Sequence, residues 1–175
     1  MASFEAAIPF LFTHEGGYVD DPNDPGGETN YGISQRFLAT IDYVNPDGKQ
    51  VLNVRDLTRN DCIRIYKLYW WDDQRYGDFN NQLLATKMLD SAVNIGKHPC
   101  ARILQKSCNK FLEPYDLLAV DGIIGDNTIN KANSLNGYQI VVNIRDYLVD
   151  YYLDLIQQNP KLDIYRKGWL KRAIS

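Results

Sequence analysis

Glu15 has the sequence context that most clearly suggests chemistry. It is one of only four glutamates, and it stands in the run His14-Glu15-Gly16-Gly17-Tyr18 after an apolar segment that predicts a helix. A carboxyl at a helix C-terminus lies at the negative end of the helix dipole, and partial burial acts in the same direction. Both effects favour the protonated acid, so Glu15 is a candidate general acid. The two glycines let a substrate approach the backbone beside it.

A second carboxylate follows in a loop rich in proline and glycine. Asp24 lies nine residues after Glu15, and Thr29 lies fourteen residues after it. If the loop folds back as a hairpin, both side chains face Glu15 across a cleft. Glycoside hydrolysis needs two carboxylates that flank a gap, one to protonate the leaving oxygen and one to activate water or attack carbon.

The acids of this loop also allow other interpretations. Asp20, Asp21 and Asp24 can simply make turn hydrogen bonds beside the prolines and glycines. A calcium loop that starts at Asp21 fails, because its twelfth position is Gly32 rather than a bidentate glutamate. The two histidines have no ligand partners at helical spacing, and serine-elbow and phosphate-loop motifs are absent. We therefore expect no metal and no cofactor.

Helical signals dominate the chain. Ser3 can cap a first helix, in which Pro9 predicts a kink or a delayed start, and Thr58 with Asp61 is typical of a capping box. Further helices are expected over 34–43, over 58–70, from Asp78 to near Gly96, from Pro99, from Asn127 and over 138–158, with a last amphipathic segment at 164–170. Residues 18–32 predict an ordered loop or short hairpin. The fold class is mainly α.

Composition narrows the class of protein. The chain has 175 residues with 45% hydrophobic and 23% charged residues and a net charge of −3, which excludes a disordered chain and a general nucleic-acid binder. The segment 161–175 is basic, with Lys161, Arg166, Lys167, Lys171 and Arg172. We favour a solvated helix face for these bases. The alternative is contact with an anionic polymer or with the acidic N-terminal segment.

The cysteines and the N-terminus indicate in which compartment the protein folds and where it acts. Cys62, Cys100 and Cys108 make an odd count, and the last two stand on one expected helix about 12 Å apart, too far for a disulfide. A reducing compartment during folding fits best. The N-terminus lacks the features of a signal peptide. We expect synthesis in the cytoplasm and action in the periplasm or cell wall after another kind of export.

The stretch from Glu15 to Ile33 resembles the signature of glycoside hydrolase family 108. These are N-acetylmuramidases of the phage endolysin and "secretion activator" type, whose catalytic glutamate lies in a Glu-Gly-Gly-Tyr motif. The resemblance implies a lysozyme-like helical fold with Glu15 as the acid. It gives supporting roles to Asp24 and Thr29, and substrate binding to Gly16, Gly17, Tyr18 and Tyr31.

The second half of the chain is similar to the predicted peptidoglycan-binding module of that family. The matching residues are Leu104-Gln105-Lys106, the loop 120–125, Thr128 and the ending 168–172. This divides the chain into a catalytic region, 1–95, and a helical region, 96–175, packed as one unit. The loop 121–125 also has a purely structural explanation, with glycines at positive φ. Among the aromatic residues 69–71, at least one is expected in the core.

The resemblance implies cleavage of the β-1,4 bond between N-acetylmuramic acid and N-acetylglucosamine, in host lysis or in protein release through the wall. Peptidoglycan strands are then the partner, with a holin or secretion system for export, no nucleic acid, no membrane insertion and a monomeric state. Asp24 can orient or deprotonate water, or stabilise positive charge. The alternatives are a catalytically silent peptidoglycan-binding or secretion-adaptor protein, an enzyme on chitin, and a lytic transglycosylase, which forms an anhydro product.

Overall fold

The computed structural model describes residues 1–20 and 27–175, so Asp21 and Asp24 lie outside the described residues. Within them the chain forms eight α-helices and one small antiparallel sheet of two strands, which confirms the mainly α, lysozyme-like fold class. None of the described helices has the length and apolar character that a bilayer span requires.

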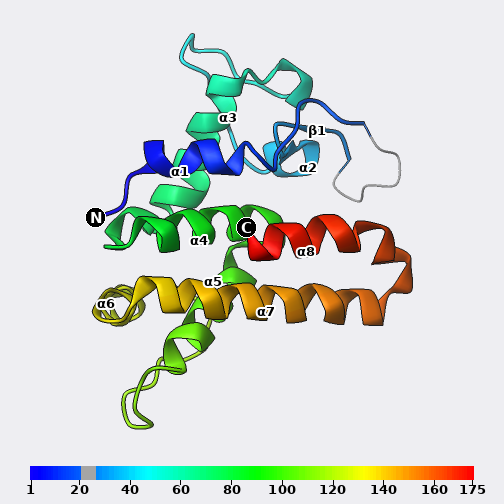
Figure 1. Ribbon diagram of the computed structural model, residues 1–175. Helices are drawn as coiled ribbons and strands as arrows, with labels where there is room; N and C mark the ends of the chain where they lie inside the picture. The colour runs from blue at the N-terminus through cyan, green and yellow to red at the C-terminus, as the bar shows by residue number, and fades with distance from the viewer. Residues whose placement is uncertain (21–26) are drawn as a thin grey trace.

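The elements follow one another in a simple order (Figure 1). The first half contains α1 (Phe4–Leu11), β1 (Thr29–Asn30), β2 (Ile33–Ser34), α2 (Gln35–Leu38), the 3-10 turn η1 (Val54–Asp56), α3 (Arg59–Tyr66), its π-helical continuation η2 (Lys67–Asp72), the 3-10 turn η3 (Tyr76–Asp78) and α4 (Gln82–Ile95). The second half contains α5 (Lys97–Asn109), α6 (Asp126–Ser134), α7 (Gly137–Gln158), the 3-10 segment η4 (Pro160–Tyr165) and α8 (Arg166–Ile174).

Two helix starts are capped as predicted. The Ser3 hydroxyl accepts a hydrogen bond from the backbone N–H of Ala6, and α1 runs on through Pro9. Thr58 and Asp61 form a reciprocal capping box at the start of α3. These caps satisfy backbone donors that the first helical turn leaves without partners.

Other boundaries differ from the sequence prediction. Asp78 does not cap α4, because it ends η3 and pairs with Arg75; the cap is Asn81, which accepts from the N–H of Leu84. The other differences are helix ends: α2 stops at Leu38 rather than near 43, α3 passes into the π-helix after Tyr66, and α5 begins at Lys97, two residues before Pro99.

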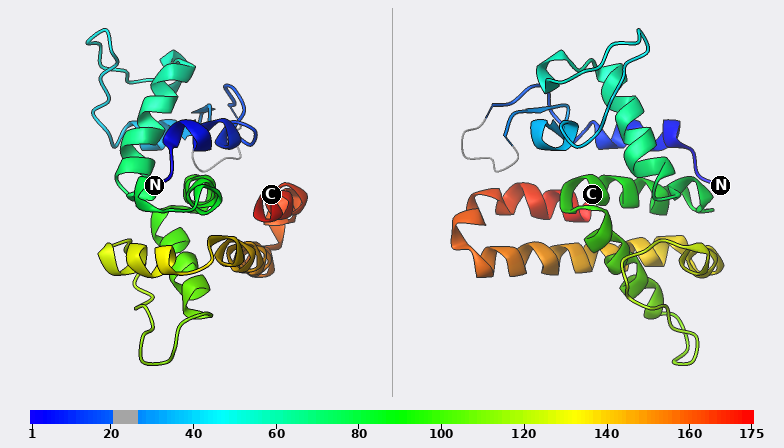
Figure 2. Two further views of the ribbon diagram at one scale, coloured as in Figure 1. Left: turned by 60° about the vertical axis from the view of Figure 1, so that its left-hand side comes forward. Right: turned by 180° about the vertical axis from the view of Figure 1, so that it is seen from behind.

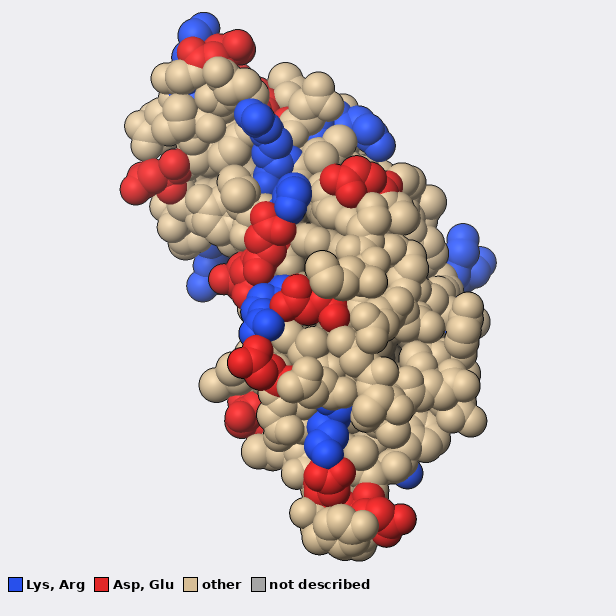
Figure 3. All heavy atoms as spheres, turned by 90° about the vertical axis from the view of Figure 1, so that its left-hand side faces the viewer, with Lys and Arg blue, Asp and Glu red and all other residues tan. Residues whose placement is uncertain are grey.

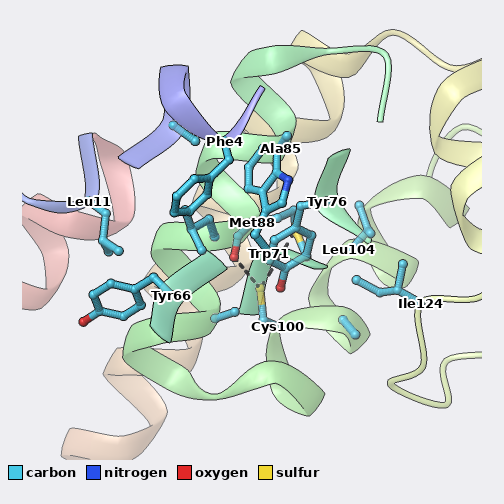
Figure 4. Close-up of a cluster of buried hydrophobic side chains, with 14 of the residues drawn as sticks. Phe4, Leu11, Tyr66, Trp71, Tyr76, Ala85, Met88, Cys100, Leu104 and Ile124 are labelled. Carbon is cyan, nitrogen blue, oxygen red and sulfur yellow. Dashed lines mark hydrogen bonds between the residues drawn. The ribbon is translucent and has the colours of Figure 1, made fainter. Parts of the chain in front are cut away.

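The helix α4 is the centre of the fold. It packs against α1, α5 and α7, and Figures 1 and 2 show it between the N-terminal elements and α7, with α8 in the same layer as α4. One continuous core of buried side chains runs from Phe4 in α1 to Ile124 beyond α5 (Figure 4). Trp71 is buried in this core, as expected for one of the three consecutive aromatic residues.

A buried lysine ties α8 to α4. Lys87 is 2% exposed, and its ammonium group donates to the backbone oxygens of Arg172 and Ala173, both at 2.8 Å. The last carbonyls of a helix have no intrahelical partner, so a cation beside them satisfies them and complements the helix dipole. Lys87 therefore fixes the C-terminal end of α8 against the central helix.

Surface charges of opposite sign lie next to each other on the face shown in Figure 3. Exposed ion pairs of the described residues include Arg75 with Asp126 at 2.7 Å and Lys97 with Asp73 at 2.9 Å. Exposed pairs of this kind contribute about 0–1 kcal/mol each to stability. The fold therefore depends on its core and its buried pairs.

Three buried thiols predict a loss of stability at alkaline pH. Burial raises the pKa of Cys62 and Cys108 to about 12 and that of Cys100 further, from an ordinary value of 9.0. The unfolded chain therefore loses these protons first, and the thiols stabilise the fold fully below about pH 9 and progressively less above it. Lys87 acts in the opposite direction, because burial lowers its pKa to about 8. It contributes one proton, whereas the thiols contribute three.

We expect the free energy of unfolding to fall between pH 9 and pH 11, by at most about 1.4 kcal/mol per pH unit for each thiol. Urea denaturation under reducing conditions measures it. The double variant Cys62→Ala/Cys108→Ala is the control and should give a shallower pH dependence. An equal slope in both proteins would contradict the assignment.

Candidate active site

Glu15 lies just beyond the C-terminal end of α1. Its backbone N–H still bonds the carbonyl of Leu11 at 3.2 Å, and its side chain is 14% exposed. The apolar face of α1, with Leu11 fully buried, packs on α4 and so fixes the position from which this carboxyl projects. The location at the end of a helix agrees with the expectation from sequence.

A tight hairpin turn closes against the Glu15 carboxylate. β1 and β2 pair with Asn30 opposite Ile33, which leaves Tyr31 and Gly32 as a two-residue turn with φ of +49° and +80°. Two positive φ angles are typical of a type I′ hairpin. A Cβ at Gly32 would overlap the Glu15 carboxylate and would lie 2.5 Å from the Tyr66 hydroxyl. Only glycine allows this close approach.

Hydrogen bonds from two side chains hold the hairpin in place. The buried Asn30 amide donates to the carbonyls of Val54 and Leu57 at 2.8 and 3.1 Å, and the Tyr66 hydroxyl donates to the carbonyl of Tyr31 at 2.9 Å. The backbone of Tyr31 is strained in its left-handed conformation, and such strain persists only where the surrounding structure enforces it. These hydrogen bonds fix the turn in its position against Glu15.

An arginine from the last helix reaches the same carboxylate. Arg172 in α8 donates from Nη2 to Oε1 of Glu15 at 2.8 Å and to Oδ1 of Asp90 at 2.9 Å. Asp90, in α4, is only 1% exposed, and its Oδ1 also lies 2.9 Å from Nδ1 of His14. Because a carboxylate only accepts, the proton of this bond is on His14. Four residues from three separate segments thus form one buried charge network.

The electrostatics of the network favour the charged arginine. Burial lowers the pKa of Arg172, but Asp90 and then Glu15 raise it more, so that the pKa lies above its ordinary value. For Tyr66, burial and then the charge of Glu15 raise the pKa well above 10.0. Tyr66 therefore remains a neutral hydroxyl beside the site, and Arg172 is a permanent cation beside the Glu15 carboxyl.

The other residues expected from sequence are distributed as follows. Thr29 lies in β1, where its backbone pairs with Val19. Gly16 and Gly17 are exposed, with open space where a side chain would stand. Tyr18 is 42% exposed and lies under the Arg55 guanidinium at 5.2 Å, while Asp24 is outside the described residues. The described structure thus brings Glu15 together with the Tyr31–Gly32 turn.

Sequence reasoning missed the main electrostatic partners of Glu15. The structure places Arg172 beside the Glu15 carboxyl, with Asp90 and His14 behind it, and none of these three residues was assigned to the site from sequence. The basic C-terminal segment was the available signal, and its alternative interpretation, contact with the acidic N-terminal segment, holds for Arg172. The solvated-face interpretation holds for Lys161, Lys167 and Lys171, which are exposed.

The second sequence motif has a structural role. The buried amide of Gln105 donates to Asp121 Oδ1 at 2.7 Å and to the carbonyl of Ile123 at 3.0 Å, and it accepts from the N–H of Gly122. Gly122 has a φ of +82° and lies against the His98 ring, so a side chain there would clash. The motif residues hold the loop 120–125 to α5, as the structural explanation of the sequence predicts.

Replacing Arg172 tests whether the network supports the fold. In Arg172→Met the buried Asp90 loses its cation, so we expect the free energy of unfolding to fall by about 3–5 kcal/mol. Arg166→Met, in the same helix, breaks only an exposed pair with Asp163 and should cost less than about 1 kcal/mol. Urea denaturation of both variants measures the difference, and equal losses would show that the network carries no stability.

Comparison with known proteins agrees with this geometry. Residues 8–96 match the family model described as Glycosyl hydrolase 108, and residues 100–174 match the one described as Predicted Peptidoglycan domain. The solved structure titled "Structure of Brucella abortus SagA" is similar, with a TM-score of 0.76 and 27% identity over 97% of this chain and 88% of that one. No curated protein matches. The chain, with Glu15 and the hairpin inside the first match, belongs to the glycosyl hydrolase 108 family.

Proposed function

We propose that this protein is an N-acetylmuramidase that cleaves the β-1,4 bond between N-acetylmuramic acid and N-acetylglucosamine in peptidoglycan. The observation that carries the proposal is the Glu15 carboxyl, which is 14% exposed and enclosed by Gly32 and Arg172 inside a glycosyl hydrolase domain. A second domain matched to peptidoglycan supports the same polymer as substrate.

Glu15 is the proton donor in this proposal. It protonates the glycosidic oxygen while the bond to the sugar breaks and positive charge develops on the ring, as in other glycosidases with paired carboxylates. The proton transfer leaves a carboxylate 2.8 Å from the Arg172 guanidinium. Arg172 binds Oε1 of Glu15, which leaves Oε2 to carry the proton, and the fixed cation stabilises the carboxylate that remains after the transfer without touching the sugar.

The remaining roles follow the family resemblance. Asp24 acts on the water or on the developing positive charge, and Thr29, next to the hairpin turn, positions the water or Asp24. The pairing of β1 with Val19 and with β2 supports a fixed place for Thr29 beside the turn. The proposed place of action is the cell wall, in host lysis or in protein release, with a holin or secretion partner for export.

Replacing the acid should abolish hydrolysis with little effect on the fold. An amide cannot donate a proton but can still accept from Arg172, so Glu15→Gln should reduce turnover on purified peptidoglycan at least about a hundredfold. The readout is mass spectrometry of the released muropeptides, which for the wild type should end in reducing N-acetylmuramic acid.

The matched control is Glu113→Gln, an exposed glutamate outside the site, which should keep wild-type turnover. Products that lack one water molecule, with anhydro ends, would assign the protein to the lytic transglycosylases instead. No release by the folded wild type would leave a binding protein and reject the enzyme.

The close approach of Gly32 to Glu15 gives a second test. Gly32→Ala forces the acid out of place, and we expect at least about a tenfold loss of turnover, because small displacements of catalytic groups are costly. Gly48→Ala carries the same backbone strain, with a φ of +77°, but its Cβ meets nothing within 4 Å. The melting temperature should fall in both variants, and further in Gly32→Ala, while turnover of the folded protein should fall only for Gly32→Ala; an equal loss of turnover in Gly48→Ala would argue against the contact.

A further inference from the structure

A hollow of about 300 Å³ adjoins the charge network on the side of α8. Its lining comes from three segments: His14 after α1, Asn94 near the end of α4, and Gly168, Trp169 and Lys171 of α8. Arg172 lines the hollow as well and also bonds Glu15, so only this arginine side chain links the hollow to the acid. A second hollow of about 380 Å³, under Tyr151 and Leu155 of α7, shares Asn94 and Trp169 with the first. The two form one path away from Glu15.

Gly168 keeps this path open. It lies inside α8, where glycine is less favourable than alanine by about 1 kcal/mol. No atom lies within 4 Å of the Cβ position, and its φ is not in the left-handed region, so neither packing nor backbone geometry requires a glycine. A side chain at this position would enter the hollow. A side chain here would therefore change only the size of the hollow that Gly168 lines.

The walls of the hollow are rigid and selective. The Trp169 ring stacks on Tyr152 at 5.2 Å and on Tyr165 at 5.4 Å, so it forms a fixed apolar wall. The Asn94 Oδ1 atom accepts from the Tyr152 hydroxyl, which leaves the amide N–H groups of Asn94 to donate to a ligand. An apolar wall with a few placed polar groups is typical of small-ligand sites, and it fits the apolar ring face and the acetamido carbonyl of an N-acetyl sugar.

The hollow has a positive charge at Lys171 that no described residue neutralises, whereas the charge of Arg172 is already compensated by Glu15 and Asp90. Lys171 and Arg172 are both part of its lining, and Lys171 makes no ion pair with residues 1–20 or 27–175. The His14 Nδ1 atom is bound to Asp90, so this ring is held in place with its other nitrogen available. A ligand with a carboxylate next to its sugar ring would match this pattern, whereas a neutral oligosaccharide would leave Lys171 without a partner.

We propose that this hollow binds a peptide-substituted N-acetyl sugar of the glycan strand, with a carboxylate of the peptide on Lys171 and the sugar against Trp169. The proposal rests on the proposed function, because it makes the hollow a subsite next to the bond that is cleaved. It assigns Gly168 the role of keeping the subsite open, and it assigns the C-terminal helix a direct part in substrate recognition.

The test uses calorimetry with a disaccharide tetrapeptide and, for comparison, a neutral N-acetylglucosamine oligomer of the same sugar length. The wild type should bind the peptide-bearing ligand more tightly. Gly168→Leu fills the hollow and should weaken binding at least about tenfold, the ratio that corresponds to 1.4 kcal/mol. Lys171→Gln should weaken binding of the peptide-bearing ligand alone. Added salt should weaken the binding of this variant less than that of the wild type.

The matched control is Lys167→Gln, which removes the same charge from an exposed position of α8 outside the hollow and should bind like the wild type. Melting temperatures show that the variants fold; if Gly168→Leu does not, the comparison of Lys171→Gln with Lys167→Gln decides. Unchanged binding in a folded Gly168→Leu, or equal effects of the two lysine changes, would overturn the subsite.

Turnover on peptidoglycan separates this proposal from the proposed function. If the wild type cleaves peptidoglycan but binds neither ligand, or binds both equally, the subsite is wrong and the muramidase stands. If it binds the peptide-bearing ligand with the expected losses in Gly168→Leu and Lys171→Gln but releases no muropeptides, the subsite stands and the enzyme is rejected.

Discussion

The burial of one carboxylate, Asp90, determines how the molecule is put together. The cost of taking an unpaired carboxylate out of water is several kcal/mol, so a helix that carries one in its core is stable only when hydrogen-bond donors, at least one of them a cation, reach it. Here Arg172 of α8 and His14 after α1 meet on Asp90, which is 1% exposed. Because Glu15 directly follows His14, the same requirement that stabilises α4 also brings the acid to its place. The stability of the fold and the geometry of the site thus depend on the same contacts.

Local features of the structure could be predicted from sequence, and long-range ones could not. The caps at Ser3 and Thr58, the helix that ends at Gln158 and the position of Glu15 after a helix all depend on neighbouring residues, and they are confirmed. The predicted cap of α4, Asp78, was wrong. Asp78 and Asn81 stand close together in the sequence, and the contact of Asp78 with Arg75 leaves Asn81 as the cap. The bond from Arg172 to Glu15 spans 157 positions, and nothing in a basic amphipathic segment distinguishes a solvated arginine from a buried one.

The two halves of the chain use their sequence motifs differently. In the first half, the glycine of the motif clears space for a reactive carboxyl at Gly32. In the second half, Gln105, Asp121 and Gly122 satisfy one another and close a loop, so these motif residues have a structural role. The contribution of this half to chemistry comes instead from α8, which has little apolar surface of its own and is held by Lys87 and Arg172.

The separation between Glu15 and Arg172 also affects the order of events during synthesis. Contacts between residues far apart in a chain form late, because the intervening loop must close first, and during translation the N-terminal part is exposed before the rest exists. The ribosome therefore releases α8 long after α1 and the hairpin have emerged. Nascent chains, and fragments cut before α8, contain the acid without its cation. Such incomplete products lack the assembled charge network around Glu15, so this network exists only in the finished chain.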